Sequence, residues 1–193
     1  MYHDLPPNSS FWPFLLSVDR DLAETTRKAG CPCGGRLHCG NFPRKPRGAD
    51  ELPEQYRTRL SFCCARDGCR KRRTPASVRF LGRKVYLAAI VVLVAAMRQG
   101  PSPRRVRELS ERFGADRRTI GRWRVFWQEL FPQTEFWKTA RGRLMAQLDM
   151  AAALPRALLE AFVRNAESCE EWGKLLYFLS PITIAGGLKI KVS

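Results

Sequence analysis

Two short cysteine-containing stretches decide the fold that this sequence predicts: CPCGG at residues 31–35 and CCARDGC at residues 63–69. Six of the seven cysteines fall between residues 31 and 69. An odd number of cysteines, with no basic segment ahead of the apolar N-terminal residues, argues against a secreted disulfide framework. Two close groups of thiols, each at a tight turn, instead form the ligand pattern of a tetrahedral metal site.

The expected ligands of one structural Zn²⁺ ion are Cys31, Cys33, Cys64 and Cys69. Glycines beside them permit the positive φ angles that tight cysteine turns need. Cys63 and Cys64 are adjacent, so we expect only one to bind, and the shorter loop to Cys69 favours Cys64. His38 and Cys39 lie close enough in sequence to substitute for Cys33 if the C-x-C turn is too tight. Four thiolates leave no open position for water, which indicates a structural rather than a catalytic site.

The charge of the chain is large and unevenly spread. The 193 residues carry 34 Lys+Arg against 18 Asp+Glu, a formal net charge of +16, and the sequence pI is about 10.3. The excess lies in residues 31–84, net +10, and residues 98–124, net +6, on either side of an uncharged apolar run at 85–97. This distribution predicts a surface that binds a polyanion, with DNA as the expected partner.

The apolar run does not favour a membrane. Its 13 residues are fewer than the roughly 20 that a membrane-spanning helix needs. We therefore expect a buried helix there, a cytoplasmic protein and no membrane partner.

Basic side chains surround the two cysteine groups, and we expect them to contact phosphates. They are Arg44, Lys45, Arg47, Arg70, Lys71, Arg72 and Arg73. Prolines at 43 and 46 hold the first group in extended backbone. Further on, Val78 and Phe80 alternate with Ser77 and Arg79, the pattern of a short strand.

A helix-turn-helix is predicted after the ribbon. The first helix is expected at about 83–99 and the second at about 103–113, with Gly114 in the turn. Asp116 is the expected N-cap of the third helix, whose buried stripe is Ile120, Trp123, Trp127 and Leu130. The basic side chains that this helix would present to DNA are Arg117, Arg118, Arg122 and Arg124. Arg118 and Arg122 lie opposite the stripe, where they would reach base edges in the major groove.

The order CPCGGRL, FCCARDGCRKRRTP and GADRRTIGRWR resembles the zinc ribbon and helix-turn-helix at the N-terminal end of bacterial insertion-sequence transposases and their companion proteins. The phrase from the third helix is similar to S-R-R-T-I-x-R-W-R in transposase and resolvase helix-turn-helices. The resemblance covers residues 31–131 and implies binding to transposon-end DNA. The C-x-C turn departs from the usual ligand spacing.

No catalytic constellation is visible in the sequence. The 62 residues after the third helix predict helices at about 134–149, 154–166 and 168–179, without the strand pattern that a carboxylate triad would need. We expect a protein that is not an enzyme and takes no small-molecule substrate. The alternatives are an RNA-binding zinc ribbon and a compact transposase with nicking activity.

The predicted architecture is thus mainly α with a small zinc ribbon. Its parts are an N-terminal helical segment at 1–30, the ribbon at 31–82, the helix-turn-helix at 83–131 and a C-terminal helical segment at 132–193. The apolar C-terminal helices would pack on the helix-turn-helix, form a homo-oligomer or contact a transposase.

Overall fold

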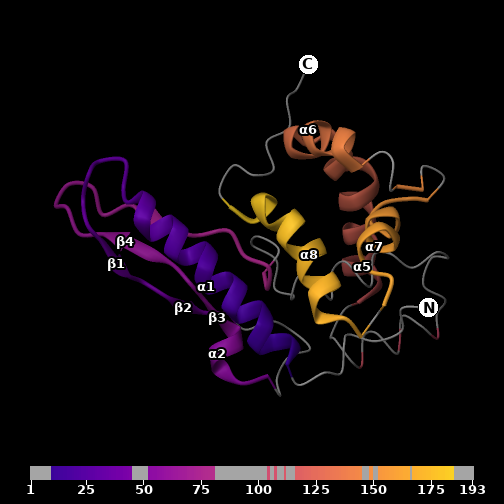
Figure 1. Cartoon of the computed structure of the whole chain (residues 1–193), viewed down its shortest axis with the longest axis horizontal. Coiled ribbons are helices and arrows are strands. Elements are labelled where there is room, and N and C mark those ends of the chain that lie inside the picture. The colour runs from indigo at the N-terminus through magenta and orange to yellow at the C-terminus, as the bar shows by residue number, and fades with distance from the viewer. Residues whose placement is uncertain are drawn as a thin grey trace.

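The computed structural model of the chain describes residues 10–44, 52–80, 116–144, 148–149, 152–165 and 167–184, with residues 104, 107 and 111 in addition. Helices predominate in these ranges and a small antiparallel sheet accompanies them (Figure 1). The prediction of a mainly α fold with a small cysteine-bearing sheet is confirmed. The expected helix at 83–99 lies outside the described residues, and the expected helix at 103–113 is represented by residues 104, 107 and 111, which are helical and exposed.

The described helices are short or amphipathic. None of them combines the length and the apolar character that crossing a membrane requires. The apolar run at 85–97 lies outside the described residues.

Helix α1 (Phe11–Ala29) packs against the other helices and leads at its C-terminal end into the cysteine-bearing sheet. Its buried residues recur at helical spacing and are Phe11, Leu15, Leu16, Asp19 and Ala23. Helix α8 (Cys169–Leu179) packs closely against α1, because Gly173 faces the ring of Phe14 where a Cβ atom would collide with it. The C-terminal end of α1 leads through Gly30, at φ 69°, into the first cysteine turn.

The cysteine-bearing ribbon comprises residues 31–44 and 52–73. Its three-stranded sheet has the order β1 (Leu37–Cys39), β4 (Phe62–Cys64), β5 (Arg72–Arg73), with all pairs antiparallel. A second pair joins β2 (Phe42–Pro43) to β3 (Thr58–Arg59), and α2 (Glu54–Arg57) leads into β3. The register places Leu37 opposite Cys64, so both cysteine turns meet at one end of the sheet.

The helical body contains the remaining elements. They are α5 (Arg117–Val125), the π-helical turn η1 (Phe126–Leu130), the 3₁₀ turn η2 (Phe131–Gln133), α6 (Glu135–Leu144), α7 (Arg156–Phe162), α8 and the 3₁₀ turn η3 (Ser180–Thr183). The three helices expected after residue 131 are present as α6, α7 and α8, although α6 and α7 are shorter than expected. One core joins this body to α1, with Trp127, Phe131 and Trp172 among its largest fully buried side chains.

The predicted buried stripe of the third helix is wrong at its last position. Ile120, Trp123 and Trp127 are buried, but Leu130 is 47% exposed. The chain widens into a π-helical turn here, and the backbone N–H of Phe131 bonds to the carbonyl of Phe126. This i→i+5 bond adds one residue to the turn. With this extra residue in the turn, Phe131 is fully buried at the core position that we expected Leu130 to take.

The strand predicted from the alternation at residues 77–80 is also wrong. Ser77, Val78, Arg79 and Phe80 are all at least 99% buried, so no exposed face alternates with a buried one. The Ser77 hydroxyl accepts hydrogen bonds from the backbone N–H groups of Arg79 and Phe80, which bends the chain instead of extending it.

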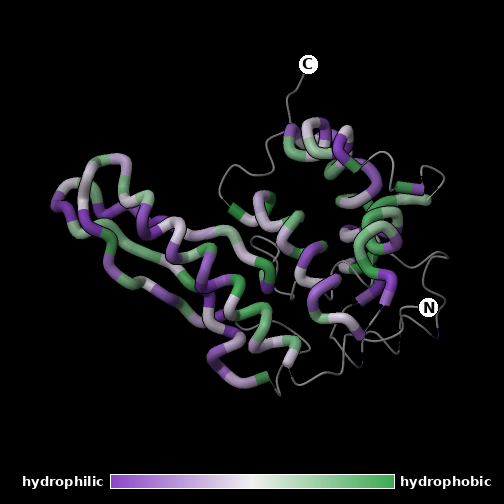
Figure 2. Tube along the Cα trace, in the orientation of Figure 1, coloured by the Kyte–Doolittle hydropathy of each residue, from purple (hydrophilic) through white to green (hydrophobic). Residues whose placement is uncertain are grey.

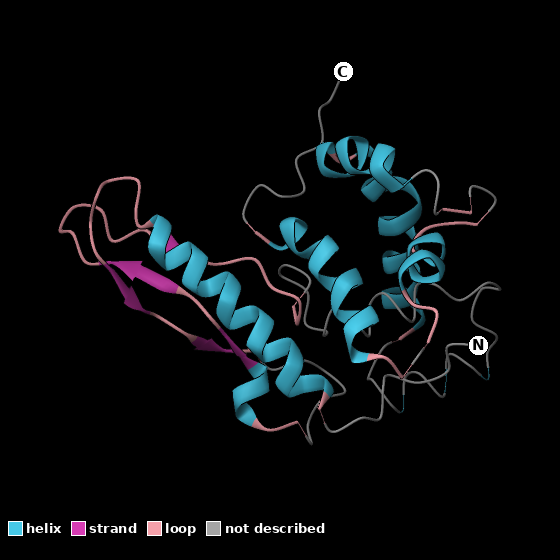
Figure 3. Cartoon of the chain, viewed as in Figure 1, coloured by secondary structure: helices cyan, strands magenta, loops and turns pink. Residues whose placement is uncertain are grey.

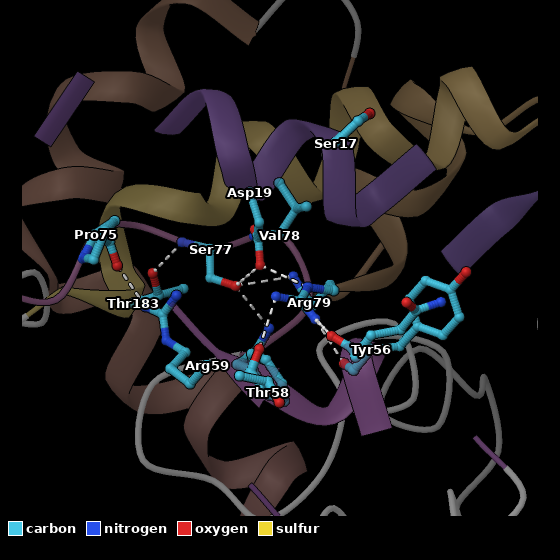
Figure 4. A network of polar contacts seen from close by, with 12 residues as sticks. Ser17, Asp19, Tyr56, Thr58, Arg59, Pro75, Ser77, Val78, Arg79 and Thr183 are labelled. Atoms are coloured by element: carbon cyan, nitrogen blue, oxygen red, sulfur yellow. Dashed lines mark hydrogen bonds and ion pairs between the residues drawn. The ribbon is translucent and has the colours of Figure 1, made fainter. Parts of the chain in front are cut away.

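A buried polar cluster holds this bend, and we call Asp19, Ser77, Arg79 and Thr183 the Asp19 node (Figure 4). Asp19 accepts hydrogen bonds from the Ser77 hydroxyl and from Nε of Arg79, at 2.7 and 2.8 Å. The other nitrogens of Arg79 donate to backbone carbonyls of the ribbon at Gln55, Tyr56 and Thr58. The Ser77 N–H donates to the Thr183 hydroxyl of η3 at 2.9 Å. The node therefore ties α1, the ribbon and the end of the helical body together.

Candidate metal centre

The first cysteine turn is built by hydrogen bonds from two backbone N–H groups, one to a carbonyl and one to a sulfur. The N–H of Gly34 donates to the Cys31 carbonyl at 2.8 Å, and Gly34 has φ 77°, in the left-handed region that glycine favours. The N–H of Gly35 then points at the sulfur of Cys33, at 3.4 Å. The turn thus aims an amide dipole at a thiol that a cation would hold as a thiolate.

The second turn follows strand β4, which ends at Cys64. The N–H groups of Cys69 and Arg70 both donate to the carbonyl of Arg66, and Gly68 has φ 79°. This tight loop brings Cys69 back to the end of the strand. The expectation of positive φ angles at the glycines beside the cysteines is confirmed at Gly34 and Gly68 but not at Gly35.

The two turns bring four sulfurs together. The Sγ atoms of Cys31, Cys33, Cys64 and Cys69 all lie within 4.8 Å of one another. Three of the separations are 3.4 Å for Cys33–Cys31, 3.5 Å for Cys33–Cys64 and 3.7 Å for Cys31–Cys69. A tetrahedral ion with metal–sulfur bonds of about 2.3 Å would separate its thiolates by roughly 3.8 Å. The cluster therefore has the size that a four-thiolate metal site requires and could hold a metal ion.

The thiols of this cluster differ in acidity. The Gly35 N–H, followed by the neighbouring thiols, lowers the pKa of Cys33 to about 6. The backbone N–H of Arg66 lowers the pKa of Cys64, but burial and the adjacent thiols outweigh that bond and raise the pKa to about 12. Several thiolates cannot share so small a space without a cation, whereas a bound divalent ion stabilises all of them.

The other predicted ligand candidates lie outside the cluster. Cys63 sits beside Gly40, where a Cβ atom would come within 2.9 Å of the Cys63 sulfur. Adjacent residues of a strand point to opposite faces, so Cys63 cannot join the group that contains Cys64. His38 and Cys39 are exposed on β1.

The basic residues expected to contact phosphate fall into different environments. Arg72 donates to the Gly40 carbonyl at 2.7 Å and lies over the Phe42 ring at 5.3 Å, so the ribbon itself uses its guanidinium. Arg73 is half-buried. Burial lowers the pKa of Arg44, which lies 5.9 Å from the centre of the Phe80 ring.

Arg70 and Lys71 are exposed. Lys45 and Arg47 lie outside the described residues.

Helix α5 begins as the sequence predicts. The side chain of Asp116 accepts a hydrogen bond from the Thr119 N–H at 2.6 Å, which makes it the N-cap. Ile120 and Trp123 are buried. The outer face carries Arg117, Arg118 and Arg122, all exposed, while Arg124 is half-buried.

Two features of the buried polar structure are not predicted from the sequence. The Asp19 node was the first, although the spacing of Phe11, Leu15 and Asp19 along α1 placed that carboxylate on the apolar face. The second was Arg59, which is 3% exposed and donates to the carbonyls of Pro75 and Ala76. Burial lowers the pKa of Arg59 to about 10, and the nearby carboxylate of Asp19 opposes that shift. Nothing in the sequence distinguished this arginine from its exposed neighbours.

Three carboxylates of the C-terminal segment make local structural contacts. Glu160 pairs with Arg156 at 2.6 Å, and Glu170 pairs with Lys174 at 2.7 Å. Glu171 accepts hydrogen bonds from the backbone N–H groups of Arg164 and Asn165. Within the described ranges, the four cysteines are the one group of three or more His, Cys, Asp or Glu side chains close enough to hold a metal.

Comparison with known proteins yields no similar family, curated protein or solved structure: none of the three searches gives a match to this chain.

Proposed function

We propose that this chain is a DNA-binding protein in which a structural zinc ion folds the ribbon and helix α5 reads the duplex. Zinc is the metal that four thiolates in a tetrahedron favour, and four protein ligands leave no position for a reacting water. The proposal assigns the ion a folding role. The small core around it supports this, since its buried members are only Cys31, Leu37 and Cys64.

The observation that carries the DNA assignment is the two-sided character of α5. Its inner side is anchored by Ile120 and Trp123, which are 1% and 3% exposed. Its outer side presents Arg118 and Arg122 to solvent near the capped N-terminus. Arginine is the side chain that pairs with guanine edges through two hydrogen bonds, and a rigid helix is the element that fits the major groove. An association with a mobile element rests on the resemblance of the cysteine and α5 motifs alone.

The metal assignment predicts about one equivalent of zinc per chain. Cys64→Ser should abolish stoichiometric zinc, because three thiolates no longer close the tetrahedron. Cys63→Ser is the matched control, because its sulfur lies outside the cluster, and Cys169→Ser should also keep the metal. Elemental analysis of the purified variants, with circular dichroism before and after chelation, measures both effects. A fully folded protein with no metal, or loss of metal in Cys63→Ser alone, would contradict the ligand set.

The DNA assignment predicts sequence preference through α5. A preferred duplex is first selected from a random pool with the wild-type protein. Arg118→Ala and Arg122→Ala should each then lose about 1–3 kcal/mol of binding free energy on that duplex and much less on a random one. Arg143→Ala, an exposed arginine of α6, is the control.

Three outcomes would count against the proposal. Equal losses on all duplexes would mean that α5 contacts only phosphates. Stronger binding to single-stranded or structured RNA than to any duplex would favour the RNA-binding alternative. Metal-dependent nicking of the selected duplex would identify an enzyme.

A further inference from the structure

Arg70 occupies a backbone conformation that its side chain disfavours. Its φ angle is 44°, and it is the one residue other than glycine with a positive φ in the described part of the chain. In this region the Cβ atom crowds the following carbonyl oxygen, so glycine is favoured there. Gly68, two residues earlier in the same loop, also has a positive φ angle, and there the residue is a glycine.

The contacts of Arg70 within the ribbon do not account for an arginine at this position. Its guanidinium pairs with Asp67 at 2.7 Å, but the two side chains are 71% and 93% exposed. An ion pair this exposed contributes little to stability. A strained residue whose side chain stabilises little is a signature of a functional contact.

Other cationic side chains surround this loop. Arg66 donates to the carbonyl of Cys33 across the two turns, and its Cβ lies where a side chain at Gly35 would be. The carbonyl of Arg36 accepts the Ala65 N–H at 2.8 Å, which places Arg36 beside the second turn. Arg36, Arg66 and Lys71 are exposed.

The end of α1 adds two more cations to this surface. Arg27 and Lys28 occupy the last turn of the helix, are exposed, and lie two to three residues before Gly30 and the first cysteine turn. The two turns and the end of α1 lie together at one extremity of the molecule (Figure 1), where hydrophilic and hydrophobic residues alternate (Figure 2). The described carboxylates on these segments are Asp67 and, one turn earlier on α1, Glu24.

We propose that this surface binds the phosphate backbone of duplex DNA, as a second contact distinct from α5. We call it the knuckle patch, and its members are Arg27, Lys28, Arg36, Arg66, Arg70 and Lys71. The proposal deepens the proposed function and rests on it. It places the main phosphate contact of the ribbon at the outer edge of the metal turns, whereas Arg72, also exposed, lies on β5 with its guanidinium against Gly40 and Phe42. Phosphates are recognised by charge without sequence information, which suits side chains on loops.

The decisive variant is Arg70→Gly. It should raise the melting temperature of the zinc-loaded protein, because glycine relieves the positive φ angle. It should also weaken binding to a random duplex by about fivefold to tenfold at roughly 0.1 M salt and reduce the salt slope by about one. If Arg70 had a purely structural role, its replacement would not make the protein more stable and at the same time weaken its binding to DNA.

Two further variants and a control complete the test. Arg36→Ala and Lys71→Ala should weaken random-duplex binding to a similar extent, with unchanged zinc content. Arg164→Ala removes an equal charge from an exposed position between α7 and α8 and should leave affinity nearly unchanged.

The proposal is overturned if Arg70→Gly binds duplex DNA like the wild type, or if it melts at a lower temperature. Equal losses in Arg164→Ala would overturn it too, because general charge would then explain the binding. Each of these results leaves the proposed function standing if the wild type binds its selected duplex. Failure of the wild type to bind any duplex overturns the proposed function itself.

Discussion

At Gly35 the metal centre has no room for a side chain. An added Cβ atom would lie 2.5 Å from the sulfur of Cys64, 2.8 Å from Cβ of Arg66 and 3.2 Å from the sulfur of Cys33. The same residue donates its N–H to the Cys33 sulfur. Gly35 is therefore required for space and for a hydrogen bond, whereas Gly34 is required for its φ angle.

Gly35→Ala should consequently weaken zinc binding and destabilise the ribbon. The added methyl group would push two ligand sulfurs off their tetrahedral positions. Overpacking of this kind costs about 1–3 kcal/mol of stability. Competition with a chromophoric chelator measures the loss of zinc affinity. Gly142→Ala on α6 is the matched control, because its Cβ would meet nothing within 4 Å and alanine favours a helix by about 1 kcal/mol over glycine. Equal zinc affinity in Gly35→Ala and wild type would show that the turn can relax.

At the level of elements, the π-helical turn η1 sets how α5 is joined to the body. In a regular α-helix Leu130 and Phe131, three and four residues after Trp127, would lie on the two flanks of the buried stripe. The wider turn exposes Leu130 and places Phe131 against Trp127, with ring centres 4.8 Å apart. An aromatic cluster that continues into α6 through Phe136 and Trp137 therefore fixes the end of the helix that carries these arginines.

The two side chains at this junction should differ strongly in mutational cost. Phe131→Ala should destabilise the protein by about 3–5 kcal/mol, the usual range for a buried phenylalanine. Leu130→Ala should cost less than about 1 kcal/mol, because much of that side chain is already in water. Urea unfolding followed by tryptophan fluorescence gives both values. The reverse order would mean that Leu130, and not Phe131, is the side chain buried in the core.

Over the whole molecule, two cores of unequal size are joined by the Asp19 node. The large core spans α1 and the helical body, while the small one lies at the metal end of the ribbon. Asp19 and Arg79 are completely buried, and their hydrogen bonds reach α1, the ribbon and, through Ser77, the last described turn. The node therefore holds the metal end in a fixed relation to the helical body.

Asp19→Asn should destabilise the whole protein by about 3–5 kcal/mol. The amide keeps the shape of the side chain but leaves the guanidinium of Arg79 buried without its counter-charge. Glu170→Gln is the matched control, because it breaks an ion pair between exposed side chains and should cost less than about 1 kcal/mol. Differential scanning calorimetry compares the two variants. A small effect of Asp19→Asn would mean that water enters the node and solvates Arg79.

The sequence by itself determined the features whose causes are local. The cysteine spacing with its adjacent glycines predicted which four sulfurs meet, and Asp116 marked the start of α5, because turns and caps depend on a few neighbouring residues. Apolar periodicity predicted the buried side of α5 as far as Trp127.

Only the tertiary structure decided the rest. The offset of Leu130 and Phe131 follows from packing against α6, and the bend at residues 77–80 follows from a carboxylate some 60 residues away along the chain. The hydrogen bond of the Arg72 guanidinium also depends on a distant partner, the Gly40 carbonyl between β1 and β2. These outcomes are fixed by contacts between segments distant in sequence, and the pattern of one segment does not specify which residue of another segment it meets.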